Sequence, residues 1–354
     1  MKKMRNSWLE LYRVLAMLLI VGNHFATQGV LPRVTVDSMP LANYVVTQLF
    51  GCGGKLGVDM FVLLTGYFLA DSQRSWSSIL RLWGTTVFWG VALLAPFALA
   101  DRVVGFGLGD ALTPLLNGHY WFVTTYCCLM LLVPYLVVLL RGIDRPRHGA
   151  LIVILVTLFS VLQKKAEMYG FSPLAWFVTI FVIGAYIRKW VDLAHVRKWI
   201  PILVLVVSAA IVAGWIVYCD FMVLDGRLKY KWTNVREMNS LPMLMISVAS
   251  FVLFAKRKPF GNRLVNALAS CMFGVYLIHE HPLVIPFLWR DALTPTAHVA
   301  GRGYALYAVG VTCGLFSACA ALEYVRVCCA KWLMFWYNAR IGVRCGHRIQ
   351  EGVL

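Results

Sequence analysis

The chain has 354 residues, of which 60% are apolar and only 14% are charged. Its mean hydropathy is +0.72. Soluble domains contain about half apolar and about a quarter charged residues, so this composition excludes a soluble globular domain.

The apolar residues form blocks of roughly twenty, separated by short charged loops, and this is the length that a helix needs to cross a bilayer. Backbone groups in lipid must pair internally, and the runs at 151–162 and 202–217 are continuously apolar rather than alternating. We therefore predict an all-α polytopic membrane bundle and not a β-barrel. About ten transmembrane helices are expected, at approximately 8–27, 52–70, 79–100, 119–140, 149–163, 172–188, 200–219, 241–255, 269–289 and 304–325.

The placement of Lys and Arg predicts the orientation, because cytoplasmic loops carry an excess of both. If the N-terminus is cytoplasmic, 21 of the 33 basic residues fall in inner segments and 11 in outer ones, with Arg13 inside the first span. Both termini are then cytoplasmic. We expect one transmembrane domain over 1–333 and a short basic cytoplasmic tail over 334–354.

Neither the net charge of +17 nor the ten cysteines predicts nucleic-acid or metal binding. The basic residues cluster at the edges of apolar blocks, where topology accounts for them, so no nucleic-acid partner is expected. No Cys and His spacing suits zinc, and most cysteines lie inside apolar blocks as small buried residues. The expected surroundings are the lipid bilayer, and no metal is expected.

Ionisable side chains within the first predicted span are the first candidates for function, because such groups are costly in a membrane. His24 lies eleven residues after Arg13, which places both on one helix face about 16 Å apart along the axis. Glu10 lies one turn before Arg13 and can pair with it. The alternative is that Glu10 and Arg13 are interfacial anchors and that His24 is a hydrogen-bonded polar residue of the bundle.

Four segments, in this order, resemble the membrane acyltransferase-3 family. They are Glu10-Leu-Tyr-Arg13 with His24-Phe25; Gly57-Val-Asp-Met-Phe61 with Thr65-Gly-Tyr-Phe68; His119-Tyr-Trp121-Phe122 with Pro134; and Phe273-Gly-Val-Tyr276-Leu-Ile-His279. The family usually has serine where this chain has Thr65, and the hydroxyl is retained. The family also has about ten spans, so the resemblance covers nearly the whole chain.

The resemblance implies acyl transfer, with acetyl as the expected group, from cytosolic acetyl-CoA or another acyl-CoA to a hydroxyl of an extracytoplasmic carbohydrate or lipid-linked glycan. The subgroup it is most similar to is the bacterial polysaccharide O-acetyltransferases, so the expected location is the bacterial cytoplasmic membrane. The donor is a substrate, and no permanently bound cofactor is expected.

The expected catalytic residues are His24, Arg13, Glu10 and His279. Arg13 would hold a donor phosphate, since guanidinium pairs well with phosphate, and Glu10 would orient it. His24 would be the general base on the sugar hydroxyl, supported by His279. Substrate-binding roles are expected for His119, Trp121 and His281. Trp121, with its neighbour Tyr120, also fits an interfacial aromatic belt, and His281 also fits a solvated residue at the span end.

The alternative function is a secondary transporter or glycan flippase, because transporters also bury arginine and histidine. Transporters tend to show internal repeats and broken spans in corresponding halves, and the sequence shows neither. A catalytically silent relative that acts as a scaffold is a third possibility.

Overall fold

The computed structural model describes residues 5–71, 77–162, 172–228 and 234–341. All regular elements within these residues are helical. They are α1 (Ser7–His24), η1 (Phe25–Val30), α2 (Leu41–Leu69), α3 (Ser77–Leu99), α4 (Leu108–Leu112), α5 (Trp121–Arg141), α6 (Arg145–Val156), η2 (Thr157–Leu162), α8 (Pro173–Trp190), α9 (Trp199–Leu224), η3 (Asn234–Arg236), α10 (Leu241–Ala255), α11 (Arg263–Ser270), α12 (Met272–His279), α13 (Val284–Pro286), η4 (Phe287–Ala292), η5 (Pro295–His298) and α14 (Tyr304–Ile341).

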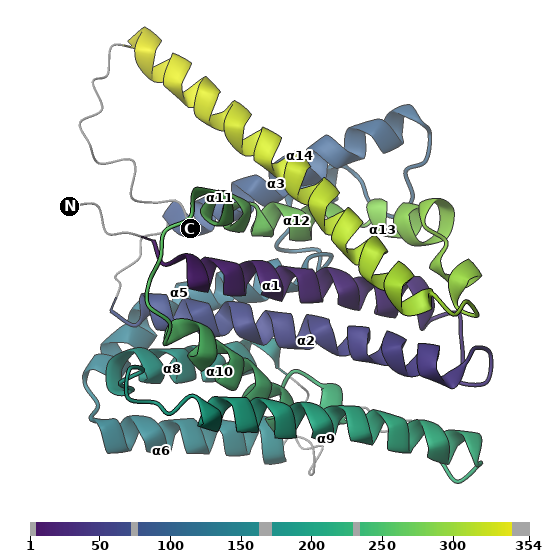
Figure 1. The fold of residues 1–354 in the computed structure, drawn as a ribbon. Helices are drawn as coiled ribbons and strands as arrows, with labels where there is room; N and C mark the ends of the chain where they lie inside the picture. Colours follow the sequence, from purple (N-terminus) through teal and green to yellow (C-terminus); the bar gives the residue numbers. More distant parts are fainter. Residues whose placement is uncertain (1–4, 72–76, 163–171, 229–233, 342–354) are drawn as a thin grey trace.

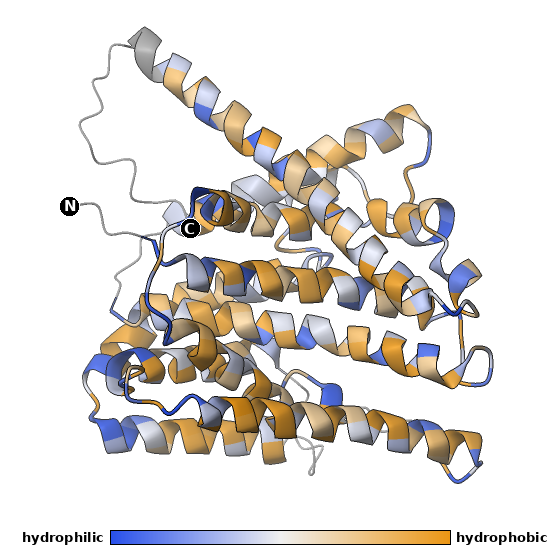
Figure 2. Ribbon diagram, viewed as in Figure 1, coloured by the Kyte–Doolittle hydropathy of each residue, from blue (hydrophilic) through white to orange (hydrophobic). Residues whose placement is uncertain are grey.

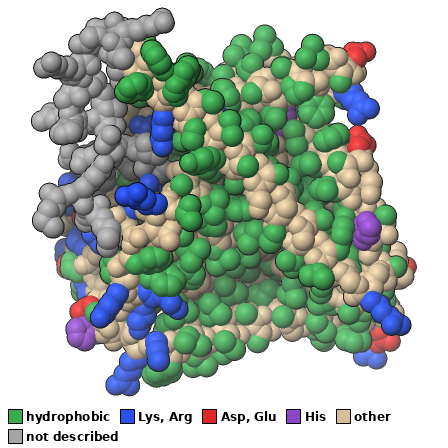
Figure 3. Space-filling model, turned by 45° about the horizontal axis from the view of Figure 1, so that its top comes forward, with side chains coloured by type: hydrophobic (Ala, Val, Ile, Leu, Met, Phe, Trp, Pro, Cys, Tyr) green, Lys and Arg blue, Asp and Glu red, His purple; other side chains and the backbone are tan. Residues whose placement is uncertain are grey.

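Helices occupy every apolar block predicted from the sequence. Among the described residues, seven helices are long and apolar enough to cross a membrane, or eight if one bent pair forms a single span. The helix α10 is apolar but has only 15 residues. Apolar side chains cover much of the surface, with Lys and Arg mostly near its edges (Figure 3). These features fit a helical membrane protein, while the count of ten spans and the orientation of the termini stay predictions.

The paired helices α1 and α2 form the centre of the bundle. Figure 1 shows α1 and α2 side by side, with α6, α8, α9 and α10 on one side of them and α3, α11, α12 and the oblique α14 on the other. In the apolar stretch of the first span 67% is buried inside the protein, and in that of α2 61% is buried. In the α6 region the buried share is only 11%. Apolar residues dominate most helices and polar ones gather at helix ends (Figure 2). The ionisable residues of α1 therefore lie in the protein interior and not against lipid.

The ninth predicted span is not one continuous helix. The segments Arg263–His279 and Val284–His298 meet at a bend of 86°. Pro282 explains this difference, because proline lacks a backbone N–H and disfavours helical geometry in the residue before it. The bend folds the second segment back against the end of α1, where Trp289 packs on Phe25.

Two predicted boundaries also differ from the structure. The helix α2 begins at Leu41, eleven residues before the expected start at 52, and contains the Gly51-Cys-Gly-Gly54 segment within it. The expected boundary at 333/334 lies inside α14, which continues to Ile341. The rest of the expected tail, 342–354, lies outside the described residues.

Close backbone contact between α2 and α8 depends on two glycines. A Cβ at Gly66 would lie 2.3 Å from the Phe181 carbonyl oxygen, and one at Gly184 would lie 2.5 Å from the Leu63 carbonyl oxygen. These neighbours are helix backbone, so the helices would have to separate to accept a methyl group.

Gly66→Ala should therefore lower the stability of the protein by about 1–3 kcal/mol, as overpacking does elsewhere. The measurement is thermal unfolding of the purified protein in one detergent. Gly214→Ala in α9 is the matched control, since nothing lies within 4 Å of its added Cβ and alanine favours the helix. Equal melting temperatures for the two variants would contradict the close contact.

Candidate active site

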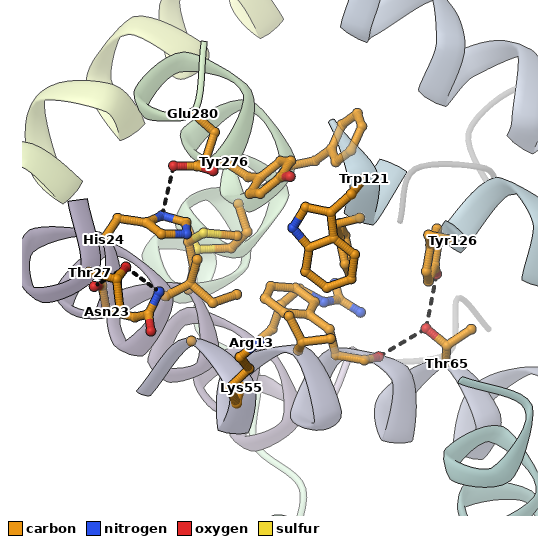
Figure 4. A pocket seen from close by; sticks show the side chains of 18 of the residues that line it. Arg13, Asn23, His24, Thr27, Lys55, Thr65, Trp121, Tyr126, Tyr276 and Glu280 are labelled. Atoms are coloured by element: carbon orange, nitrogen blue, oxygen red, sulfur yellow. Dashed lines mark hydrogen bonds and ion pairs between the residues drawn. The ribbon is translucent and has the colours of Figure 1, made fainter. Parts of the chain in front are cut away.

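A cavity of about 530 Å³ runs along one face of α1. Arg13 and His24, predicted to share a face, both line it. Its wall also contains aromatic side chains of α5 and α12 and polar side chains at the end away from Arg13 (Figure 4). The lining residues that the following paragraphs use are Arg13, His24, Gln28, Thr65, Trp121, Phe122, Tyr126, Tyr276 and Glu280.

Glu10 links two arginines at one end of this face. One carboxylate oxygen lies 2.8 Å from Arg13 Nη1, and the other lies 2.8 Å from Arg5 Nη2. The spacing of Glu10 and Arg13 predicted their ion pair, and it is present. Two cations share one buried carboxylate here, so this end of the cavity has positive charge available for an anionic ligand.

His24 contacts His279 across the cavity wall. The Nδ1 atom of His24 lies 2.9 Å from His279 Nε2, and His279 Nδ1 lies 2.5 Å from the Val275 carbonyl oxygen. A carbonyl oxygen only accepts, so His279 Nδ1 carries the proton, and Nε2 of a neutral His279 is then an acceptor. His24 Nδ1–H donates toward it, which leaves His24 Nε2 unprotonated. No described residue hydrogen-bonds to that Nε2 atom, so it is the available base.

Glu280 provides a second acceptor for the same proton of His24. Its Oε1 atom lies 3.1 Å from His24 Nδ1 and accepts a hydrogen bond from Gln28 Nε2 at 2.7 Å. Gln28 in turn accepts from Trp289 Nε1 at 2.9 Å. Figure 4 shows Glu280 directed at His24. The carboxylate is thus fixed in place and can stabilise an imidazolium on His24.

Two local backbone features bring these groups together. Residues Phe25–Val30 form a π-helical turn directly after His24, and such turns are common at functional sites. On the facing side, helix α12 ends at His279 because Pro282 follows, and Glu280 occupies the C-cap position. After the bend, Trp289 lies against Gln28 and donates a hydrogen bond to it. The break at Pro282 therefore positions residues of the site.

An aromatic wall faces the two polar ends of the cavity. Phe122 stacks on Tyr126 with ring centroids 5.6 Å apart, and Phe122 also meets Tyr276 edge to face at 5.5 Å. The Tyr126 hydroxyl lies 2.9 Å from Thr65 Oγ1. Trp121, an expected substrate-binding residue, lines the same wall. The wall combines apolar ring faces with hydroxyl groups, and a sugar has the same combination of apolar and hydroxyl surface.

The structure does not bring His119 or His281 to the cavity. His281 is fully buried, with Nε2 at 3.3 Å from the Gly90 carbonyl oxygen and Nδ1 accepting from Leu283 N–H. It stabilises the bend, so its expected role as a substrate-binding residue has no geometric support. His119 lies 3.9 Å from Asp110, beside α4 and outside the cavity wall. Its expected role in substrate binding therefore has no geometric support either.

Asp59 and Lys55, which lie four residues apart on α2, have separate partners. Asp59 is fully buried and accepts from Trp176 Nε1 at 3.0 Å. Lys55 lies 3.8 Å from Glu237 at the cavity edge. Asp59 therefore joins α2 to α8 and orients no histidine.

The groups His24, His279 and Glu280 also have the composition of a metal site. Their ligand atoms lie within 4.8 Å of one another, and two histidines with a carboxylate can bind zinc or a related ion. This cluster is not predicted from the sequence, because its two histidines are 255 residues apart in the chain. The same groups can also contact one another directly, without a metal ion. Measuring the metal content of the purified protein distinguishes the metal-bound site from the metal-free one.

A family model described as an acyltransferase domain matches residues 6–324. The chain belongs to this acyltransferase family. The match extends from α1 to Tyr324 within α14 and includes every residue of the cavity wall. Comparisons of this acyltransferase with curated proteins and with solved structures give no match.

Gln28 and Tyr126 of this acyltransferase have no role assigned from the sequence, in which Glu280 fits either an acceptor contact or a solvated residue at the span end. Glu280 had one usable signal, since it follows His279 at the end of an apolar run and precedes a proline by two residues. Gln28 had none, because its partner is 252 residues away in the chain.

Proposed function

We propose that this acyltransferase moves an acyl group, in the first instance acetyl, from cytosolic acyl-CoA to a hydroxyl of an extracytoplasmic glycan or lipid-linked sugar. The protein would lie in a bacterial cytoplasmic membrane with its N-terminus inside. The observation that carries the proposal is the hydrogen-bonded group of His24, His279 and Glu280 on the same cavity as Arg13.

In the proposed reaction the acceptor hydroxyl oxygen attacks the thioester carbonyl carbon of the donor. The hydroxyl proton passes to Nε2 of His24, because its Nδ1 already donates to His279 or Glu280. A C–O bond forms, the C–S bond breaks, and the proton then passes from His24 to the CoA thiolate. Between these two proton transfers His24 is positively charged, and the Glu280 carboxylate beside it stabilises that charge.

The two ends of the cavity suit the two substrates. Arg13, with Glu10 beside it, contacts the donor where the donor enters the cavity, since guanidinium is matched to phosphate and to carbonyl oxygen. The separation of Arg13 and His24, roughly 16 Å along α1, leaves room for an extended thioester arm. The acceptor ring would pack on the aromatic wall near Trp121, whose faces are apolar while its edge N–H is polar.

The test is transfer of radiolabel from acetyl-CoA to a panel of polysaccharides by the purified full chain in lipid nanodiscs. We expect labelled glycan with the wild type, and a raised KM for acetyl-CoA in Arg13→Ala, by about tenfold for the loss of one charge-assisted contact. Arg5 remains to pair with Glu10 in that variant. If acetyl-CoA is not consumed across the panel, the transport alternative is favoured instead.

A further inference from the structure

A second cavity of about 340 Å³ lies at the Arg13 end of the bundle, between the start of the chain, α3, α11 and α14. Four basic side chains line it, from three separate segments, against one carboxylate. The residues are Arg5, Arg81, Arg326, Lys331 and Glu323. A pocket with this balance is suited to a ligand with several negative charges.

The pairing of these side chains leaves part of the positive charge free. Glu323 already binds Arg326 through two contacts, at 2.6 and 2.7 Å, and it accepts from Trp89 Nε1. Among the described residues, no ion pair joins Arg81 or Lys331 to a carboxylate, and both are exposed. Arg81 and Lys331 can therefore bind an anion without breaking an existing pair.

The two cavities are adjacent and share part of their walls. Leu82, Ser270 and Phe273 line both of them. The Glu10 carboxylate also connects them, because its partner Arg5 lines the second cavity and its partner Arg13 lines the first. A ligand that is polyanionic at one end and slender at the other could occupy both.

We propose that the second cavity binds the clustered phosphates of the nucleotide end of acyl-CoA, with the pantetheine arm passing Ser270 and Phe273 toward His24. This inference rests on the proposed function, and it adds Arg81 and Lys331 to the donor site as residues that touch the nucleotide end only. An anionic lipid headgroup offers the same phosphate chemistry, so the test separates the two sources.

The test is equilibrium binding of CoA, dephospho-CoA and adenosine 3′,5′-bisphosphate to the full chain in nanodiscs of phosphatidylcholine. We expect the double variant Arg81→Ala/Lys331→Ala to bind CoA and the bisphosphate at least about tenfold more weakly than the wild type, as loss of charge-assisted hydrogen bonds predicts. In turnover, KM for acyl-CoA should rise while kcat changes little. The matched control is Arg147→Ala/Lys198→Ala, which removes the same charge at exposed positions outside both cavities.

Equal affinities of the wild type and the double variant for the bisphosphate would overturn the inference. So would a defect that appears only in nanodiscs with anionic lipid, because that result assigns the cavity to a headgroup. Failure of the proposed function looks different, since the wild type itself would then bind no CoA. Weakened binding by the double variant supports the site even with an acceptor panel that yields no transfer.

Discussion

Replacement of His24 by alanine should lower the rate of acyl transfer by about 10²- to 10⁴-fold, the range that general base catalysis contributes. His24 is the only histidine among the described residues that lines the main cavity, and its Nε2 atom is the unprotonated nitrogen there. The loss should appear in kcat, because the proposed site for the nucleotide end of the donor does not include His24. The measurement is the initial rate of label transfer at saturating acetyl-CoA and acceptor.

His195→Ala is the control for this substitution. His195 lies in the loop before α9, its side chain is 86% exposed, and its partner is Asp192 in the same loop. We expect a wild-type rate. A His24→Ala protein that keeps its melting temperature and its CoA affinity but transfers within a few-fold of the wild-type rate would remove His24 from the mechanism.

The membrane helices could be predicted because each depends on a local property of the sequence. A block such as 200–219 is apolar throughout, and a helix occupies it in the structure as α9. The shared face of Arg13 and His24 follows from helix geometry alone. Such features need no knowledge of what packs against the helix.

Features that depend on distant contacts could not be predicted in the same way. The sequence places Glu280 next to His279, but it does not show that residue 280 meets Gln28 and His24 of the first span. The second cavity combines Arg5 with Lys331, at opposite ends of the chain. Only tertiary packing, which hydropathy does not encode, sets such pairs.

The proline after His281 was the overlooked local signal. An apolar run over 269–289 resembles one span when residues are averaged, yet Pro282 stops the helix within it. The bend buries His281 against Gly90 and Phe106, which is why this histidine does not reach the cavity. It also places Glu280 at a helix end, where its side chain is free to turn toward α1.

Glu280→Gln should be the second most damaging substitution, with kcat lowered by about 10²- to 10⁴-fold, by analogy with the loss of the carboxylate that orients a catalytic histidine. The glutamine has the same shape and can still accept from Gln28. It cannot stabilise positive charge on His24 during proton transfer, and its NH₂ group can present a donor to His24 Nδ1 and favour the wrong tautomer. Because Glu280 acts through His24, it is a positioning residue.

The readout that separates positioning from simple folding is the division of the effect between kcat and KM. We expect KM for acetyl-CoA to stay near the wild-type value, partial recovery in Glu280→Asp, and a pH–rate profile altered relative to wild type. Asp192→Asn, at an exposed loop position, should behave as wild type. If Glu280→Gln raised KM and left kcat intact, the carboxylate would be a substrate contact, and the charge on His24 would need another partner in the cavity wall.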